Sequence, residues 1–123
     1  MMAGDRASAA LGIELVEAGH DRAVARLKVR ADMVNGHAIA HGGIVFALAD
    51  TAFACACNST PPVTVAAGAE ITFIRPARLG AELVAEAVLR ASYGRRGLYD
   101  VTVRRGAEVI AEFRGHSQQL AIQ

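Results

Sequence analysis

The chain has 123 residues, of which 53% are hydrophobic, with 13 Lys and Arg residues against 12 Asp and Glu residues. This near-neutral balance excludes a typical nucleic-acid-binding protein, which carries a strong basic surplus, and the apolar content excludes a disordered chain. A chain of this length is expected to form one domain over residues 1–123, with a single core.

The hydropathy pattern predicts no association with a membrane. The N-terminus has no apolar run of signal-peptide length, and the longest apolar run, residues 44–57, is interrupted by Asp50. A helix that spans a bilayer needs roughly 20 apolar residues. Cys55 and Cys57 lie two apart within one predicted helix, so their side chains diverge and can neither pair nor share a metal. Two small buried thiols favour a reducing, cytoplasmic location.

The predicted elements begin with a short helix that is capped by Asp5 and runs to Ala10. Two strands are predicted next, at residues 12–18 and 22–30. In the second strand, apolar residues alternate with Arg and Lys, which is typical of a half-buried strand.

Residues 31–43 are rich in Asn, Gly and His and are predicted to form a loop that enters a helix over residues 44–58. This helix is apolar on all sides, so it is expected to be buried on all sides. Pro61 and Pro62 follow it and cannot continue a helix.

The remainder of the chain is predicted to form four strands, at residues 63–75, 82–92, 97–105 and 108–119. Short connections containing Pro or Gly separate these strands, so each is expected to pair antiparallel with the next. The pattern predicts an α+β domain in which an antiparallel sheet wraps around one long central helix. One small sheet cannot cover a helix on every side. A second copy of the chain is therefore expected to cover the remaining face, which gives at least a homodimer.

Gly42 and Gly43 stand where the predicted helix opens. The first N–H groups of a helix have no intrahelical partner and carry a partial positive charge. Because neither residue has a side chain, a ligand oxygen can approach these amides, and this is the layout of an oxyanion site. The alternative is a tight turn that uses Gly for its dihedral angles.

Asp50 interrupts the most apolar segment of the chain, where a charge is expensive to desolvate. It lies seven residues after Gly43, or roughly 10 Å along the helix axis, so one small reacting group cannot touch both within one chain. Two helices packed side by side in a dimer would bring them together across the interface. Burial raises the basicity of a carboxylate, which suits a general base or a nucleophile. The alternative is a structural Asp that is hydrogen-bonded to the backbone or to Thr51.

Asn35 and His41 flank the same loop and are candidates for orienting a water molecule or a substrate carbonyl. A His beside two Gly residues also suits a partner that fixes the loop. No metal site is predicted, because His37 and His41 precede the helix and have no third ligand near them in sequence. A serine hydrolase is disfavoured because the chain has no G-x-S-x-G motif.

Taken together, N-G at Asn35, H-G-G at His41 and A-D-T-A around Asp50 resemble the signature of the hotdog-fold acyl-CoA thioesterases. The stretches HGGIVFALADTAFACACNS, FIRPA, YDVTV and FRGHSQ resemble more closely the phenylacetic-acid degradation thioesterases of the PaaI type. The resemblance runs from about Leu11 to Gln119, which is nearly the whole chain.

The resemblance implies a hotdog fold, a homodimer that pairs into a homotetramer, and hydrolysis of an acyl-CoA thioester without a metal or bound cofactor. Carried over by position, Asp50 is the general base or nucleophile, and the Gly42 N–H of the facing subunit polarises the thioester carbonyl. Asn35 and His41 position the carbonyl or the water. The residues expected to contact the substrate are Gly43, Thr51 and Phe46.

Within this interpretation, arginines near strand ends are candidates for binding the phosphates of CoA. They are Arg75, Arg78, Arg95, Arg96, Arg104 and Arg105. The aromatic candidates for lining an apolar acyl pocket are Phe46, Phe53 and Phe73.

Two alternative functions use the same residues. A hydratase or dehydratase acting on an acyl thioester needs a His opposite an acid, but His41 precedes the helix, where it better suits a role in positioning a carbonyl. A non-catalytic acyl-CoA-binding protein has no use for a buried charge at Asp50.

Overall fold

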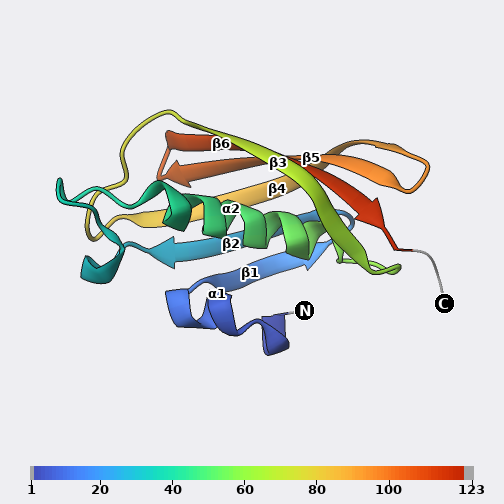
Figure 1. Ribbon diagram of the computed structural model, residues 1–123, viewed down its shortest axis with the longest axis horizontal. Helices are drawn as coiled ribbons and strands as arrows, with labels where there is room; N and C mark the ends of the chain where they lie inside the picture. The colour runs from blue at the N-terminus through green and yellow to red at the C-terminus, as the bar shows by residue number, and fades with distance from the viewer. Residues whose placement is uncertain (1, 121–123) are drawn as a thin grey trace.

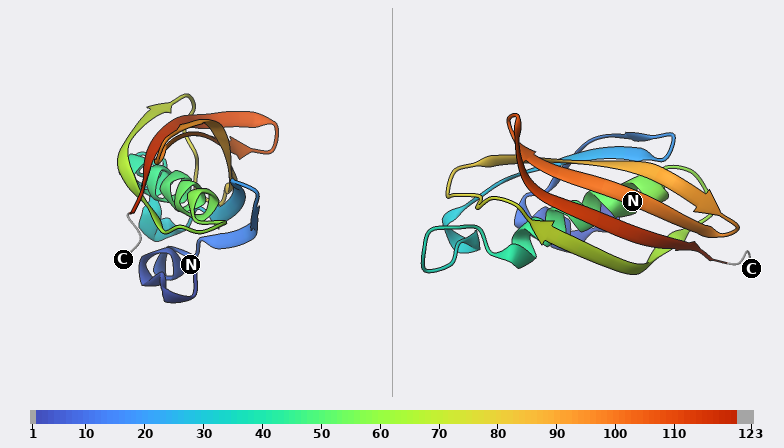
Figure 2. Two further views of the ribbon diagram at one scale, coloured as in Figure 1. Left: turned by 90° about the vertical axis from the view of Figure 1, so that its right-hand side faces the viewer. Right: turned by 90° about the horizontal axis from the view of Figure 1, so that it is seen from above.

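The computed structural model describes residues 2–120, which form a six-stranded antiparallel sheet curved around one long helix, α2 (Gly42–Cys57) (Figure 1). Viewed along the helix, the sheet curls around α2, and a short helix, α1 (Arg6–Leu11), lies outside the curl (Figure 2). The strands are β1 (Glu14–Gly19), β2 (Arg22–Lys28), β3 (Thr64–Phe73), β4 (Glu82–Tyr93), β5 (Arg96–Arg105) and β6 (Glu108–Gln119). Two 3₁₀ turns complete the fold, η1 (Met2–Gly4) and η2 (Ala31–Met33). The predicted hotdog architecture is confirmed.

The strand order is β1-β2-β4-β5-β6-β3, and this corrects one predicted pairing. β4, β5 and β6 pair in sequence as expected, but β3 pairs with β6 rather than with β4. The reason is that β2 already occupies that side of β4, in a register that runs from Arg22↔Val88 to Lys28↔Glu82. The connection after β3 therefore crosses the N-terminal end of α2, where the Ala40 N–H donates to the Ala77 carbonyl at 2.7 Å (Figure 1).

Two element boundaries also differ from the prediction. Helix α2 begins at Gly42 rather than at residue 44, so Gly42 and Gly43 form its first turn. The first strand begins at Glu14 rather than at residue 12. Gly12 instead caps α1 in the left-handed conformation, with φ of 74°, and its N–H bonds back to the helix carbonyls.

The core lies between α2 and the concave face of the sheet. The strands present mainly small and branched side chains to the helix, such as Ala85, Ala87 and Val101, which lets the helix approach closely. Phe53, which is 1% exposed, fills the space above Gly115, and its ring contacts those of Tyr99 and Phe113 with centroids 5.5 and 5.8 Å away.

Gly115→Ala is expected to lower the free energy of unfolding by about 1–3 kcal/mol, because a Cβ there would lie 2.8 Å from three ring carbons of Phe53. Thermal unfolding followed by circular dichroism measures this. Gly68→Ala is the matched control, since its Cβ meets only His116 at 4.0 Å. A Gly115→Ala protein as stable as this control would contradict the packing described.

Within one chain, α2 is not buried on all sides. Gly43 is exposed, and Ala47, Asp50 and Ala54 are only half-buried, so these four residues form one open stripe along the helix. Strand β3 is an edge strand whose residues are mostly exposed, including Val65 at 42% and Phe73 at 52%. An apolar helix stripe beside an unpaired strand edge is the kind of surface that a partner covers.

Candidate functional site

The loop before α2 is fixed by its own hydrogen bonds. Asn35 Oδ1 accepts from the N–H groups of His37 and Ile39, at 2.9 and 3.3 Å, and Asn35 N–H donates to the Ile39 carbonyl at 2.8 Å. Ala38 takes a positive φ of 59° at the tip. The carboxamide oxygen of Asn35 therefore shapes the loop, and its Nδ2 is the group left to meet a ligand.

His41 is the N-cap residue of α2. Its N–H donates to the Met33 carbonyl at 2.8 Å, and its carbonyl accepts from Ile44 and Val45 in the first turn. The side chain makes no capping hydrogen bond and is exposed. The backbone of His41 thus sets the direction of the helix, while its imidazole stands free beside the opening.

The N–H groups of Gly42 and Gly43 have no acceptor within residues 2–120. They belong to the first turn of a 16-residue helix, so the helix dipole adds to their partial positive charge. A Cβ at Gly42 would lie 3.0 Å from the Phe73 ring, so glycine here allows that ring to pack on the helix terminus. Two open amides beside an aromatic ring suit a carbonyl oxygen that gains negative charge.

A hollow of about 340 Å³ adjoins these amides. Its walls come from the loop before α2, the first turns of the helix and the chain after β3. The residues that line it include Ile39, Gly42, Val45, Phe73, Ile74 and Arg75. The lining is mainly apolar, and the Arg75 guanidinium at its edge contacts Glu108 and the Val109 carbonyl.

Asp50 lies in the open stripe of α2, half-buried, and its carboxylate has neither a hydrogen bond nor an ion pair with any described residue. Burial raises the pKa of Asp50 above its ordinary value. Thr51 does not bond to it. The Thr51 hydroxyl lies 3.0 Å from Ser8 Oγ. A half-buried carboxylate without a partner in its own chain is typical of a reactive group rather than a structural one.

Thr51 takes part in a chain of hydrogen bonds that ends at α1. Ser8, which is 4% exposed, donates from Oγ to Asp5 Oδ2 at 2.7 Å, so the contact between Ser8 and Thr51 has Thr51 as the donor. Bonds from Ser8 also lower the pKa of Asp5. The predicted substrate residue Thr51 therefore has its proton engaged and can only accept a hydrogen bond from a ligand.

The aromatic candidates lie in different places. Phe53 is core, and Phe46 is half-buried with its ring edge-on to Phe113 at 5.3 Å. Phe73 alone of the three lines the hollow beside Gly42.

Within one chain the candidate residues fall into two groups that lie apart. Gly42, Gly43, Asn35 and His41 lie together at the start of α2, while Asp50 lies about 10–12 Å further along the axis at 1.5 Å per residue. Gly43 of the first group and Asp50 lie on the same open stripe of α2. Residues 2–120 hold no group of three or more His, Cys, Asp or Glu that could bind a metal. In the same range, no helix is long and apolar enough to cross a membrane.

The sequence did not reveal Ser8 as the partner of Thr51, because the two are 43 residues apart. A weak signal existed in the Asp5-x-x-Ser8 spacing, which is that of a capped helix N-terminus. Nothing in the local sequence indicates which residue faces the cap from another element.

The sequence of the chain is similar to those of known proteins. The family model described as "Thioesterase superfamily" matches residues 37–111. The acyl-coenzyme A thioesterase PaaI of Escherichia coli (strain K12) is 40% identical over 98% of this chain and 86% of that protein.

Solved structures agree with this match. The structure of E. coli PaaI, from the phenylacetic acid degradation operon, superposes with a TM-score of 0.95 at 39% identity, covering 98% of this chain and 88% of that one. A mutant of the phenylacetic acid degradation protein PaaI from Thermus thermophilus superposes with a TM-score of 0.90 at 36% identity, covering 94% of this chain and 100% of that one.

Proposed function

The chain belongs to the thioesterase superfamily, and we propose that it hydrolyses acyl-CoA thioesters at a composite site built by two copies of the chain. The observation that carries this proposal is that Gly43 and Asp50 lie on one open stripe of α2. The unpartnered carboxylate of Asp50 and the free amides of Gly42 and Gly43 are complementary in charge, yet they are too far apart to act together within one chain.

The reaction follows from these groups. The thioester carbonyl oxygen of the substrate binds at the Gly42 and Gly43 N–H groups, which stabilise the negative charge of the tetrahedral intermediate. Asp50 of the facing chain accepts a proton from water while the water oxygen attacks the carbonyl carbon. The C–S bond then breaks, and the proton passes to the leaving thiolate of CoA. In the alternative route an Asp50 oxygen attacks the carbonyl carbon and the C–S bond breaks, which releases the CoA thiolate and leaves a mixed anhydride. Water then hydrolyses the anhydride to the free acid and regenerates the Asp50 carboxylate. Neither route requires a metal or a bound cofactor.

The loop residues have supporting roles. Asn35 Nδ2, left free because Oδ1 fixes the loop, can donate to the substrate carbonyl or to the water. The exposed imidazole of His41 can orient the same groups. Thr51 is an acceptor only, so its contact with the substrate requires a donor such as an amide N–H of the pantetheine arm.

We propose an aryl-acetyl group, such as phenylacetyl or hydroxyphenylacetyl, as the acyl part of the substrate. The similarity to two PaaI proteins whose descriptions refer to phenylacetic acid degradation supports this class. The hollow next to Gly42 offers an apolar surface for a ring, formed by Val45, Phe73 and Ile74. Phe46 lies one turn after Gly42 in α2. Arg75 and Arg78 lie on the same crossing segment, and their proximity to the hollow supports them as candidates for binding the CoA phosphates.

The open surfaces of α2 and β3 support a proposal for the assembly. We propose a homodimer in which the α2 stripe and the β3 edge of each chain face those of the other, with two dimers joined as a homotetramer. A cytoplasmic location is proposed as well, supported by the two buried free thiols of Cys55 and Cys57.

Free-thiol release from a panel of CoA thioesters tests the proposed reaction. The panel holds acetyl, hexanoyl, palmitoyl, benzoyl, phenylacetyl and hydroxyphenylacetyl CoA. The expected result is the highest kcat/KM with the two aryl-acetyl members. Turnover that favours palmitoyl or acetyl CoA would contradict the acyl class, and a folded protein that binds the thioesters without releasing thiol would contradict the reaction.

The pH dependence provides a second test. Asp50 must be ionised to act, and burial raises its pKa above the ordinary value of about 3.9. Thioesterase activity, as kcat/KM, is therefore expected to fall as the pH drops through that raised pKa. A profile that stays flat down to the ordinary pKa of an exposed carboxyl group would contradict the role of Asp50.

A further inference from the structure

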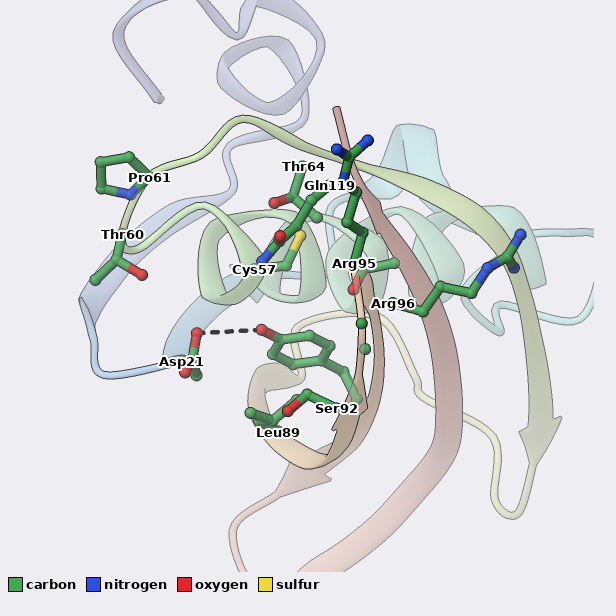
Figure 3. Close-up of a pocket in the computed structure, with 14 residues that line it drawn as sticks. Asp21, Cys57, Thr60, Pro61, Thr64, Leu89, Ser92, Arg95, Arg96 and Gln119 are labelled. Atoms are coloured by element: carbon green, nitrogen blue, oxygen red, sulfur yellow. Dashed lines mark hydrogen bonds between the residues drawn. The ribbon is translucent and has the colours of Figure 1, made fainter. Parts of the chain in front are cut away.

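A second cavity, of about 200 Å³, lies at the opposite end of α2 from Gly42 (Figure 3). It is enclosed by the C-terminal end of the helix at Cys57, the β1–β2 turn at Asp21, the hairpin between β4 and β5, and the adjoining ends of β3 and β6. Its volume equals that of about seven water molecules at ~30 Å³ each, so its occupant is small. Neither the candidate catalytic carboxylate nor the glycine amides line it.

The concave face of the sheet changes character at this cavity. Along α2 the inner residues of β5 and β6 are apolar, such as Val101, Val103 and Phe113. Beyond the end of the helix, the same faces present Gly97, Ser117 and Gln119. The lining of the cavity therefore offers polar groups, whereas the rest of this face packs against the helix with apolar side chains.

Ser117 is the most informative residue of the lining. The residue as a whole is 4% exposed, but every buried side-chain N or O atom of the described residues has a partner, so its hydroxyl oxygen, which forms no hydrogen bond within residues 2–120, is open to the cavity. A Cβ on Gly97 would lie 2.7 Å from Ser117 Oγ and 3.1 Å from the Tyr99 ring, so glycine at position 97 preserves the space in which this hydroxyl stands. A hydroxyl group that opens on a cavity can donate a hydrogen bond to a ligand and accept one from it.

The wall of the cavity that Asp21 and Tyr99 form supplies hydrogen-bond acceptors. Tyr99 donates its hydroxyl proton to Asp21 Oδ1 at 3.3 Å, which leaves the tyrosine oxygen and the second carboxylate oxygen able to accept (Figure 3). Burial, followed by the negative charge of Asp21, raises the pKa of Tyr99, so the phenol stays protonated. This wall suits a hydroxyl group of a ligand.

The rim carries positive charge. Arg95 and Arg96 adjoin the cavity on the β4–β5 hairpin, and neither forms an ion pair with a residue in 2–120, whereas Arg22, Arg90 and Arg114 on the neighbouring strands all do. Both guanidinium groups are exposed and extend away from Asp21 (Figure 3), so rotation of their side chains can bring them over an anion. With Asp21 as the one carboxylate of the lining, the site carries a net charge of about +1 and matches a monoanion.

We propose that this cavity binds a short hydroxycarboxylate of about six or seven non-hydrogen atoms, at a site separate from the thioesterase site. The carboxylate pairs with Arg95 and Arg96, and the hydroxyl group lies between Ser117 and the Asp21–Tyr99 pair. The ligand thus satisfies both the unpaired cations and the unpartnered hydroxyl.

Calorimetric titration of the full-length protein with glycerate tests the proposal. Saturable binding is expected, with Kd raised about tenfold or more by Arg95→Gln/Arg96→Gln and about tenfold by Ser117→Ala. Propionate, which lacks the hydroxyl groups, and glycerol, which lacks the charge, are each expected to bind more weakly. Arg105→Gln, a charge-matched control at the opposite end of β5, and Asp50→Asn should both leave Kd unchanged.

Amide chemical shifts distinguish loss of contact from loss of fold. Glycerate is expected to move the signals of Gly94 and Gly97 and leave those of Gly42 and Gly43 unmoved. The proposal is overturned if glycerate does not bind, or if the double arginine variant binds it as tightly as the wild type. It is also overturned if adenosine 3′,5′-bisphosphate displaces glycerate, because the hairpin arginines would then belong to a CoA nucleotide site.

Discussion

Asp50→Asn is expected to lower kcat for aryl-acetyl CoA hydrolysis by about 10²–10⁴-fold, because the amide cannot accept the proton of the attacking water. The change is nearly isosteric, and the carboxylate it replaces has no hydrogen bond within the described chain to lose. Free-thiol release under saturating substrate measures it. Asp32→Asn, which removes an exposed carboxylate from η2, is the control and should keep full activity.

Asp50→Asn is also expected to raise the thermal stability of the protein, although it lowers the activity. Because the pKa of Asp50 is raised in the folded state, the folded chain binds the proton more tightly than the unfolded chain, and folding stability falls as the pH rises through this range. Asn has no charge to desolvate. The Asp50→Asn protein is therefore expected to melt at a higher temperature than the wild type at pH 7. A variant that loses activity because it unfolds would instead melt lower, and that result would contradict the assignment.

Gly42→Pro is expected to lower kcat by about 10²–10³-fold, because proline has no N–H to stabilise the oxyanion. Proline suits the first position of a helix, so α2 should still form. Gly42→Ala keeps the N–H but adds the same Cβ, which meets the Phe73 ring at 3.0 Å. Comparison of kcat for the two variants separates the lost donor from the crowding. Equal losses in both would contradict an oxyanion role for this amide.

Local patterns in the sequence were sufficient to predict most of the helices and strands. Alternation along residues 22–30 predicted a half-buried strand, and the apolar run broken by Asp50 predicted the central helix. Gly42 and Gly43 predicted that the first N–H groups of that helix are accessible to a ligand. These features depend on neighbours within one or two turns, which a sequence displays directly.

What could not be predicted depends on contacts between distant segments. The pairing of β3 with β6 arises because β2 fills the side of β4 that a simple meander would use. The bond between Ser8 and Thr51 and that between Asp21 and Tyr99 each join residues brought together only by the closed sheet. Gly115 gave no signal of its own, because its role is set by the ring of Phe53 above it.

Mixing the two inactive variants tests the central claim, that each site takes Asp50 from one chain and the Gly42 amide from another. Purified Asp50→Asn and Gly42→Pro proteins are unfolded together and refolded, so that the chains exchange. Random pairing makes about half of the dimers mixed, and each mixed dimer holds one intact site. Thiol release at about a quarter of the wild-type rate is therefore predicted, while each variant refolded alone stays inactive. If the mixture remains as inactive as its parents while the wild type, refolded in the same way, recovers, the site lies within a single chain and the composite arrangement is wrong.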